Sequence, residues 1–151
     1  MGTQPDHQVV IHHRPDCGNE AEAKAIEEAL ILAMQALDLP RGAEIALVLS
    51  DDNELASLNA RFRAKQGPTD VLSFPVAPED LPEGLEPVLG DVLISVAYAQ
   101  RSAEKAGHSR LDELRLLAVH GLLHLVGHQD ETEAGAEAMR ALEIKLGVRR
   151  E

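Results

Sequence analysis

The sequence predicts an α+β fold, in which a mixed sheet of about four strands packs against about five helices. Four short apolar runs have the length of strands. Stretches with apolar residues at helical spacing separate the first run from the second and the second from the third. Helical sequence then dominates the C-terminal third. Because 151 residues with 44% hydrophobic composition can bury a core of their own, we expect one domain over residues 1–151.

The first two predicted strands flank a helix. Residues 8–13 (QVVIHH) form the first strand, and Asn19 is expected to cap a helix that runs to about Leu37. Residues 44–50 (EIALVLS) form the second strand. Their nearly continuous apolar run is typical of a strand that is covered on both faces.

A second helix is expected from Asn53 to about Ala64, with Ser50 or Asp51 as its cap. Its end carries Arg61, Arg63 and Lys65, the most basic patch in the first half of the chain. Cations at this end of a helix are favoured by the helix dipole. Without further information, this patch is best interpreted as a solvated helix end.

Residues 70–76 (DVLSFPV) and 89–95 (LGDVLIS) form the third and fourth predicted strands. Pro75 has no N–H group for a sheet hydrogen bond, so the third strand should lie at an edge or end there. Residues 77–88 contain prolines and acids and are expected to form a surface loop.

The C-terminal part of the chain predicts three helices, over residues 95–106, 109–126 and 131–146. Ser109 is a good cap for the second of them, and Asp112 three residues later approximates a capping box. This second helix is the most apolar of the three.

Two histidines interrupt that apolar helix. His120 and His124 are four residues apart and therefore project from one face, where two nitrogens can reach one metal ion without strain. Gly127 is expected to end the helix, and His128 and Asp130 follow as possible third ligands. Two histidines and one carboxylate with an open position form a known catalytic zinc set.

A zinc protease is the rival interpretation of this helix. The HExxH motif of those enzymes needs a glutamate beside the first histidine as general base. That position holds Gly121 in the run HGLLH. The missing glutamate argues against peptide hydrolysis by that mechanism.

Three blocks of the sequence resemble a known family. HGLLHLVGHQD resembles the HGxLHLxGxDH signature of the YbeY family of metal-dependent endoribonucleases. LNARFRAKQGPTDVLSFPV resembles its LNxxYRxKxxPTDVLSFPF block, and LGDVLIS resembles its LGDIxIS block. The likeness covers residues from about 44 to 146. It implies a zincin-like site for one Zn²⁺ ion on the central helix, held by the matching His120 and His124.

The third ligand departs from the family pattern. The family has a histidine at the last position of its signature, where this chain has Asp130. We expect Asp130 to be the third ligand through a carboxylate oxygen, and His128 is the alternative. The resemblance also implies that Arg63 lies near the metal, where a guanidinium can hold a phosphate. The predicted catalytic residues are therefore Arg63, His120 and His124.

The resemblance implies a zinc-dependent endoribonuclease that cleaves single-stranded RNA in small-subunit ribosomal RNA maturation and ribosome quality control. Expected partners are ribosomal RNA, the ribosome or its small subunit, and assembly factors, but neither membranes nor DNA. A different metallohydrolase, such as a peptidase, and a non-catalytic ribosome assembly factor are the alternatives. A net charge of −12 suits a protein partner at least as well as naked RNA. One cysteine and no run of about 18 apolar residues predict a soluble, cytoplasmic protein.

Overall fold

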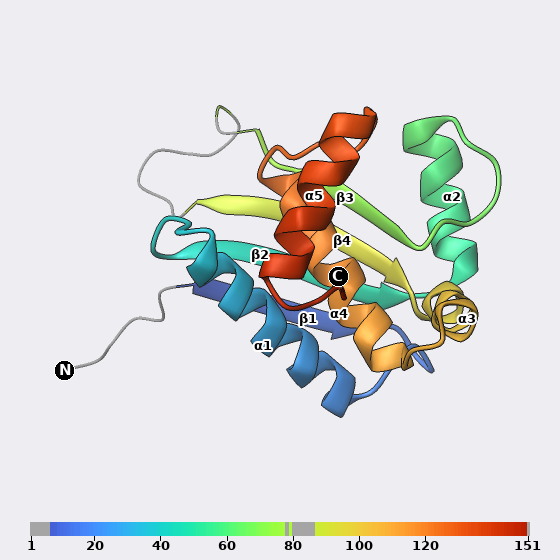
Figure 1. The fold of residues 1–151 in the computed structure, drawn as a ribbon. Coiled ribbons are helices and arrows are strands. Elements are labelled where there is room, and N and C mark those ends of the chain that lie inside the picture. The colour runs from blue at the N-terminus through green and yellow to red at the C-terminus, as the bar shows by residue number, and fades with distance from the viewer. Residues whose placement is uncertain (1–6, 78, 80–86, 151) are drawn as a thin grey trace.

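A computed structural model describes residues 7–77, 79 and 87–150, and it shows the predicted mixed sheet of four strands (Figure 1). The order across the sheet is β1-β2-β4-β3. The first three strands in this order are parallel to one another, and β3 is antiparallel to β4. The strands are β1 (His7–His13), β2 (Ala43–Ser50), β3 (Val71–Pro75) and β4 (Val88–Ser95).

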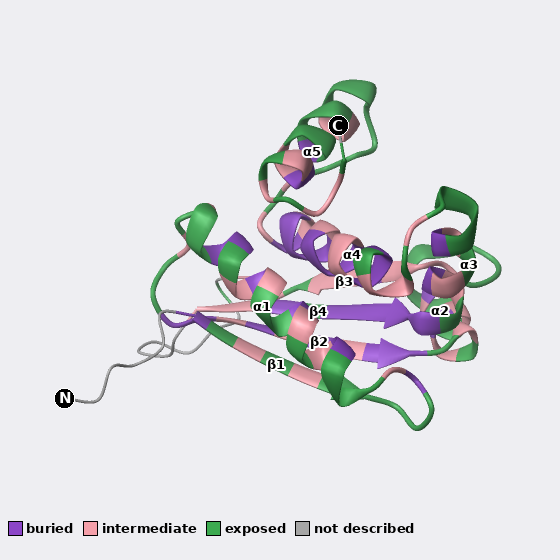
Figure 2. Ribbon diagram, turned by 60° about the horizontal axis from the view of Figure 1, so that its bottom comes forward, coloured by how far each residue is buried: buried purple, intermediate pink, exposed green. Residues whose placement is uncertain are grey.

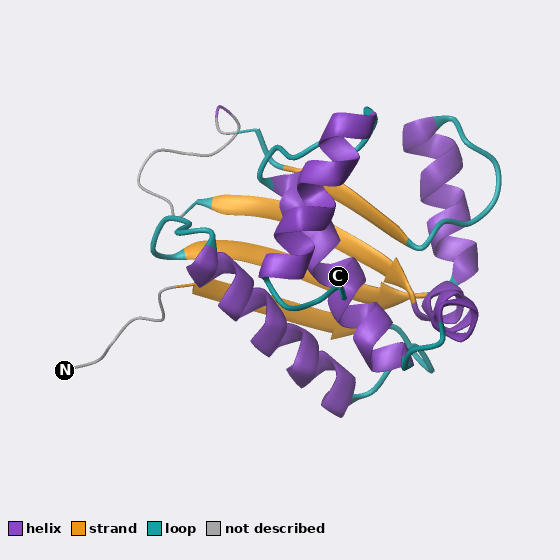
Figure 3. Cartoon of the chain, viewed as in Figure 1, coloured by secondary structure: helices purple, strands orange, loops and turns teal. Residues whose placement is uncertain are grey.

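Five helices accompany these strands in the part of the chain that the structure describes (Figure 3). The helices are α1 (Glu20–Ala36), α2 (Asp52–Arg63), α3 (Val96–Ala106), α4 (Arg110–Leu125) and α5 (Glu133–Lys145). Each begins after a residue whose side chain accepts a hydrogen bond from the first turn; these caps are Asn19, Asp51, Ser95, Ser109 and Thr132. The predicted α+β fold is confirmed, with boundaries that differ by about two residues or less.

The helices cover the sheet unequally (Figure 2). The main hydrophobic core joins α1 and α4 to one face of the sheet. A smaller cluster of Leu55, Leu72 and Leu93 joins α2 to β3 and β4. Figure 2 shows α5 stacked on α4, on the side away from the sheet. The central helix α4 is thus enclosed by the sheet, by α1 and by α5.

β3 is the edge strand next to β4, and Pro75 is its last residue, as predicted. The strand ends where Gly90 of β4 lies close to it: a Cβ atom at Gly90 would meet the Phe74 carbonyl oxygen at 2.2 Å. Most of the predicted loop over 77–88 lies outside the described residues. No helix in the described part of the chain is long and apolar enough to cross a membrane.

Candidate metal centre

Three donor groups converge at the C-terminal end of α4. His120 and His124 lie one helical turn apart, and their Nε2 atoms are 3.0 Å from each other. The helix ends at Leu125, and Gly127, with a φ of 103°, lets the chain turn back. Asp130 thereby places its Oδ2 atom 3.3 Å from His120 Nε2 and 3.6 Å from His124 Nε2.

The hydrogen bonds of the two Nδ1 atoms determine whether the Nε2 atoms of His120 and His124 present lone pairs to the cluster. His120 Nδ1 lies 2.8 Å from Glu143 Oε2, and His124 Nδ1 lies 3.0 Å from the carbonyl oxygen of His128. A carboxylate and a carbonyl only accept hydrogen bonds, so both Nδ1 atoms donate. In the neutral rings both Nε2 atoms then present lone pairs, beside a carboxylate oxygen. Such a group of acceptors is stabilised by a positive charge between them, either a metal ion or a proton on one Nε2 atom.

A zinc ion fits this donor set. Ligand atoms at 2.0–2.1 Å from a tetrahedral ion are about 3.3 Å apart, which matches the three separations in this cluster. His120, His124 and Asp130 form the one group of this kind among the described residues. Two imidazoles and one carboxylate leave a fourth position for water or substrate. The chemistry and the spacing of the donors therefore allow these three side chains to hold a metal ion with one position left open.

The surroundings shift the pKa values of the two histidines in opposite directions. Burial works to lower the pKa of His120, but the hydrogen bond to Glu143 and the charges of Glu143 and Asp130 outweigh it and raise that pKa. Burial and the neighbouring His120 lower the pKa of His124. His120 is therefore the ring that holds a proton first when no metal ion is bound.

Among the described residues, the group of side chains that could hold a metal ion does not include His128. Its contribution is the backbone carbonyl that accepts from His124 Nδ1. The loop that carries Asp130 lies tightly against the first turn of α5, where a Cβ atom at Gly135 would meet the Gln129 carbonyl oxygen at 2.3 Å. The geometry thus places Asp130, rather than the ring of His128, beside the two imidazoles.

Glu143 was not singled out in the sequence. It lies on α5 with 1% of its surface exposed, and its Oε1 atom accepts a hydrogen bond from Arg149 Nε at 3.0 Å. A signal for it does exist in the sequence. Glu143 is four residues after the buried Met139, so it occupies a core position of the helix, where a charged residue needs a partner.

Arg63 lies in the last turn of α2, with an exposed side chain. It makes no hydrogen bond or ion pair with another described residue. Its positive charge nevertheless contributes to the low pKa of His124, after burial and the charge of His120, so it lies within electrostatic range of the cluster. The structure brings His120, His124 and Asp130 into contact and leaves Arg63 within electrostatic range, with no ion-pair partner among the described residues.

Gly121 packs against the sheet, so a glutamate at this position, as in a zinc protease, would require neighbouring side chains to shift. A Cβ atom at this position would lie 2.6 Å from Val92 Cγ1 and 3.2 Å from Ser73 Oγ. Ser73 Oγ also donates a hydrogen bond of 3.2 Å to the Gly121 carbonyl oxygen. Any side chain here would point at the sheet.

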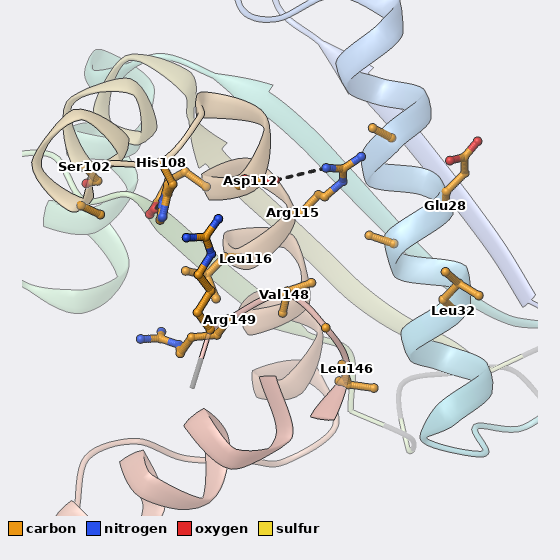
Figure 4. Close-up of a pocket in the computed structure, with 16 residues that line it drawn as sticks. Glu28, Leu32, Ser102, His108, Asp112, Arg115, Leu116, Leu146, Val148 and Arg149 are labelled. Atoms are coloured by element: carbon orange, nitrogen blue, oxygen red, sulfur yellow. Dashed lines mark hydrogen bonds and ion pairs between the residues drawn. The ribbon is translucent and has the colours of Figure 1, made fainter. Parts of the chain in front are cut away.

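The cavity shown in Figure 4 lies elsewhere, between α1, α3, α4 and the segment after α5. It measures about 790 Å³, and none of the three clustered residues lines it. Leu32 of α1 and Val148 of the C-terminal segment contribute apolar lining, while His108 and Arg149 contribute polar groups. The cluster of His120, His124 and Asp130 is therefore separate from this cavity.

Comparison with known proteins gives one consistent result. The profile of a family described as Endoribonuclease YbeY matches residues 11–149. Endoribonuclease YbeY of Rhodopseudomonas palustris (strain CGA009) is 44% identical, over 96% of this chain and 80% of the relative. The protein of that name from Geobacillus thermodenitrificans is 39% identical, over 87% of this chain and 90% of the relative. A solution structure from Thermotoga maritima shares the fold, with a TM-score of 0.59, 22% identity and coverage of 91% of this chain and 88% of that one.

Proposed function

The chain belongs to the YbeY family, and from this premise we propose that it is a zinc-dependent endoribonuclease specific for single-stranded RNA. The observation that carries the proposal is the convergence of two imidazole lone pairs and a carboxylate at 3.0–3.6 Å from one another. We further propose that one domain, residues 1–151, performs this activity. Its substrates would be ribosomal RNA precursors, in small-subunit maturation and ribosome quality control.

His120, His124 and Asp130 would hold the zinc ion. When bound, zinc lowers the pKa of a water molecule to about 7 and polarises phosphoryl oxygens. The two imidazoles keep their Nε2 atoms directed inward because their Nδ1 atoms are fixed by Glu143 and by the His128 carbonyl. The protein thus supplies a preorganised donor set, so little reorganisation is needed on metal binding.

Arg63 would bind the scissile phosphate. Hydrolysis adds water to phosphorus and breaks one P–O bond, and negative charge grows on the phosphoryl oxygens as this happens. An unpaired guanidinium can donate two parallel hydrogen bonds to those oxygens. Gly121 leaves no general base at the position that zinc proteases use, which favours phosphate over peptide chemistry.

The substrate should be single-stranded, because an unpaired strand exposes both its backbone and its bases to a surface site. Phe62 is next to Arg63 in the sequence and is 59% exposed. Arg61 lies over its ring, with the guanidinium carbon 5.8 Å from the ring centroid. An exposed aromatic face beside cations is the arrangement on which unpaired bases stack.

The proposal includes cytoplasmic action on the ribosome or its small subunit, together with assembly factors, and no DNA or membrane partner. The net charge of −12 supports contacts with protein partners in addition to RNA. RNA would approach by the local cations at the end of α2, since the molecule as a whole is acidic.

An Arg63→Ala variant tests the catalytic role. We expect cleavage of a single-stranded RNA to slow by about 100-fold or more, as for loss of one group that stabilises transition-state charge. Zinc content should stay at one ion per chain, because Arg63 is not one of the proposed zinc ligands. Lys24→Ala, which removes an exposed charge from α1, is the control. Cleavage by Arg63→Ala at the rate of the control would refute the proposed role.

A further inference from the structure

We propose that Glu143 and Arg149 form an orienting pair that holds His120 in the ring tautomer and rotation needed for metal binding. This inference rests on the proposed zinc site and deepens it. It extends the metal centre to a part of the chain that lies well beyond the last ligand, Asp130. Glu143 and Arg149 are positioning residues in this scheme, since neither touches the ion or the substrate.

Both oxygens of the Glu143 carboxylate are engaged. Oε2 accepts from His120 Nδ1 at 2.8 Å, and Oε1 accepts from Arg149 Nε at 3.0 Å. With 1% of its surface exposed, Glu143 has almost no access to water that could replace either partner. The carboxylate is therefore held from two sides, and its direction toward His120 is determined.

The contact controls His120 in two ways. A carboxylate accepts but does not donate, so it requires the proton of a neutral ring to be on Nδ1 and the lone pair to be on Nε2. The negative charge also makes Nε2 a stronger donor to a metal ion. His124 obtains its orientation from the backbone carbonyl of His128 instead. His120 is thus the imidazole whose orientation depends on another side chain.

Arg149 supplies the charge that a buried carboxylate needs. An uncompensated buried charge is strongly destabilising, whereas a hydrogen-bonded pair is tolerated. The turn after α5 brings Arg149 back to Glu143: Gly147 has a φ of 81°, and the Val148 N–H donates to the Glu143 carbonyl oxygen at 3.0 Å. The segment after α5 therefore takes part in holding the metal ligand.

The test measures zinc affinity by competition with a chelator. We expect Glu143→Ala to weaken zinc binding by about 10- to 100-fold, as for other partners of metal-bound histidines. Glu143→Gln, which can still accept from His120, should fall between this variant and the wild type, and Arg149→Ala should weaken binding least. Glu137→Gln, an exposed carboxylate on α5, and Arg150→Ala, the exposed neighbour of Arg149, are the matched controls.

A second readout does not need zinc. In the metal-free protein above about pH 8, imidazole ¹⁵N chemical shifts should place the His120 proton on Nδ1. Glu143→Ala should redistribute that proton between the two nitrogens, while His124 keeps its tautomer. Circular dichroism checks that the variants are folded, and Glu143→Gln retains the shape of the side chain if Glu143→Ala unfolds.

The two readouts separate the inference from the proposed function. If the wild-type protein binds no zinc, the proposed function fails, and the His120 tautomer still decides on the orienting pair. If all variants bind zinc as the controls do and His120 keeps its tautomer, the orienting pair is wrong and the zinc site stands. Weaker zinc binding together with a changed tautomer supports both.

Discussion

Two histidine–glutamate contacts lie along α4 in the described part of the chain, and one of them belongs to the group of side chains that could hold a metal ion. His108 Nε2 contacts Glu113 near the start of the helix, and His120 Nδ1 contacts Glu143 near its end. Both carboxylates are buried, with 6% and 1% of their surface exposed. The two pairs differ in which ring nitrogen faces the carboxylate.

What each ring can do depends on which groups lie around its other nitrogen, since either imidazole nitrogen can bind a metal ion. At the start of α4, Nε2 is occupied by Glu113, and no group of three metal-binding side chains within the described residues includes His108. At the end of the helix, Nε2 is left for His124 and Asp130. A buried histidine–carboxylate pair alone is thus not a sign of metal binding. The sign is that further donor atoms converge on the second nitrogen of the ring.

The largest expected difference comes from removing each histidine in turn. His120→Ala should lose stoichiometric zinc and slow RNA cleavage by more than about 100-fold, because the ion loses a ligand. His108→Ala should keep zinc and activity but lose about 1–3 kcal/mol of stability, since buried Glu113 loses its partner. Metal analysis, a cleavage assay and chemical unfolding measure these effects. Equal zinc loss in both variants would contradict the distinction between the pairs.

A smaller but sharper difference concerns the third ligand. Asp130→Ala should weaken zinc binding by at least about 10-fold, because the carboxylate that faces both imidazoles is gone. His128→Ala should change the affinity by less than about 3-fold, since His128 acts through a backbone carbonyl that alanine also has. Isothermal titration with zinc compares the two variants directly. The opposite order would make His128 the ligand.

The smallest expected effect is on stability at acid pH. It concerns Asp52, a carboxylate that is paired with an arginine instead of a histidine. Hydrogen bonds from Arg101 and then Ser95 lower the pKa of Asp52, although burial opposes them. A carboxyl group whose pKa is lowered in the folded state stabilises the protein at pH values above its unfolded pKa of about 3.9. This stabilisation is lost as the pH falls through the folded-state pKa.

Arg101→Ala should therefore move acid unfolding to higher pH, by about half a unit or less. The measurement is circular dichroism between about pH 6 and pH 2, on metal-free protein so that zinc release does not contribute. An Arg101→Lys variant, which keeps the charge, should lie closer to the wild type. A shift to lower pH in Arg101→Ala would reverse the sign derived for Asp52.

Much of the fold follows from local sequence signals. The apolar runs and the caps Asn19 and Ser109 are local features, and each predicted element has its counterpart in the structure. Pro75 correctly predicted an edge or a strand end because a missing N–H group is a property of one residue. The pairing of β2 with β4 is not local. It depends on contacts between segments far apart in the chain, which periodicity does not encode.

The site divides in the same way. His120, His124 and Asp130 lie within one helix and its following turn, so the sequence made all three candidates, with His128 as the alternative third ligand. Glu143 contacts His120 across 23 residues, through the packing of α5 on α4. An acidic residue on an amphipathic helix is usually solvated. The spacing from Met139 places Glu143 on the core face of α5, unlike the exposed Glu137, but only the three-dimensional packing shows that its partner is His120.

The close contact between Gly121 and Val92 has a consequence for the history of such sites. The run HGLLH differs from the HExxH motif of zinc proteases by a single substitution, of Gly121 by glutamate. The sheet occupies the space that the new side chain would enter, because Val92 Cγ1 lies 2.6 Å from the position of its Cβ atom. Val92 would have to change as well, and the carboxylate would still face the sheet. Exchange of Gly121 for glutamate would therefore not by itself supply the general base of a zinc protease.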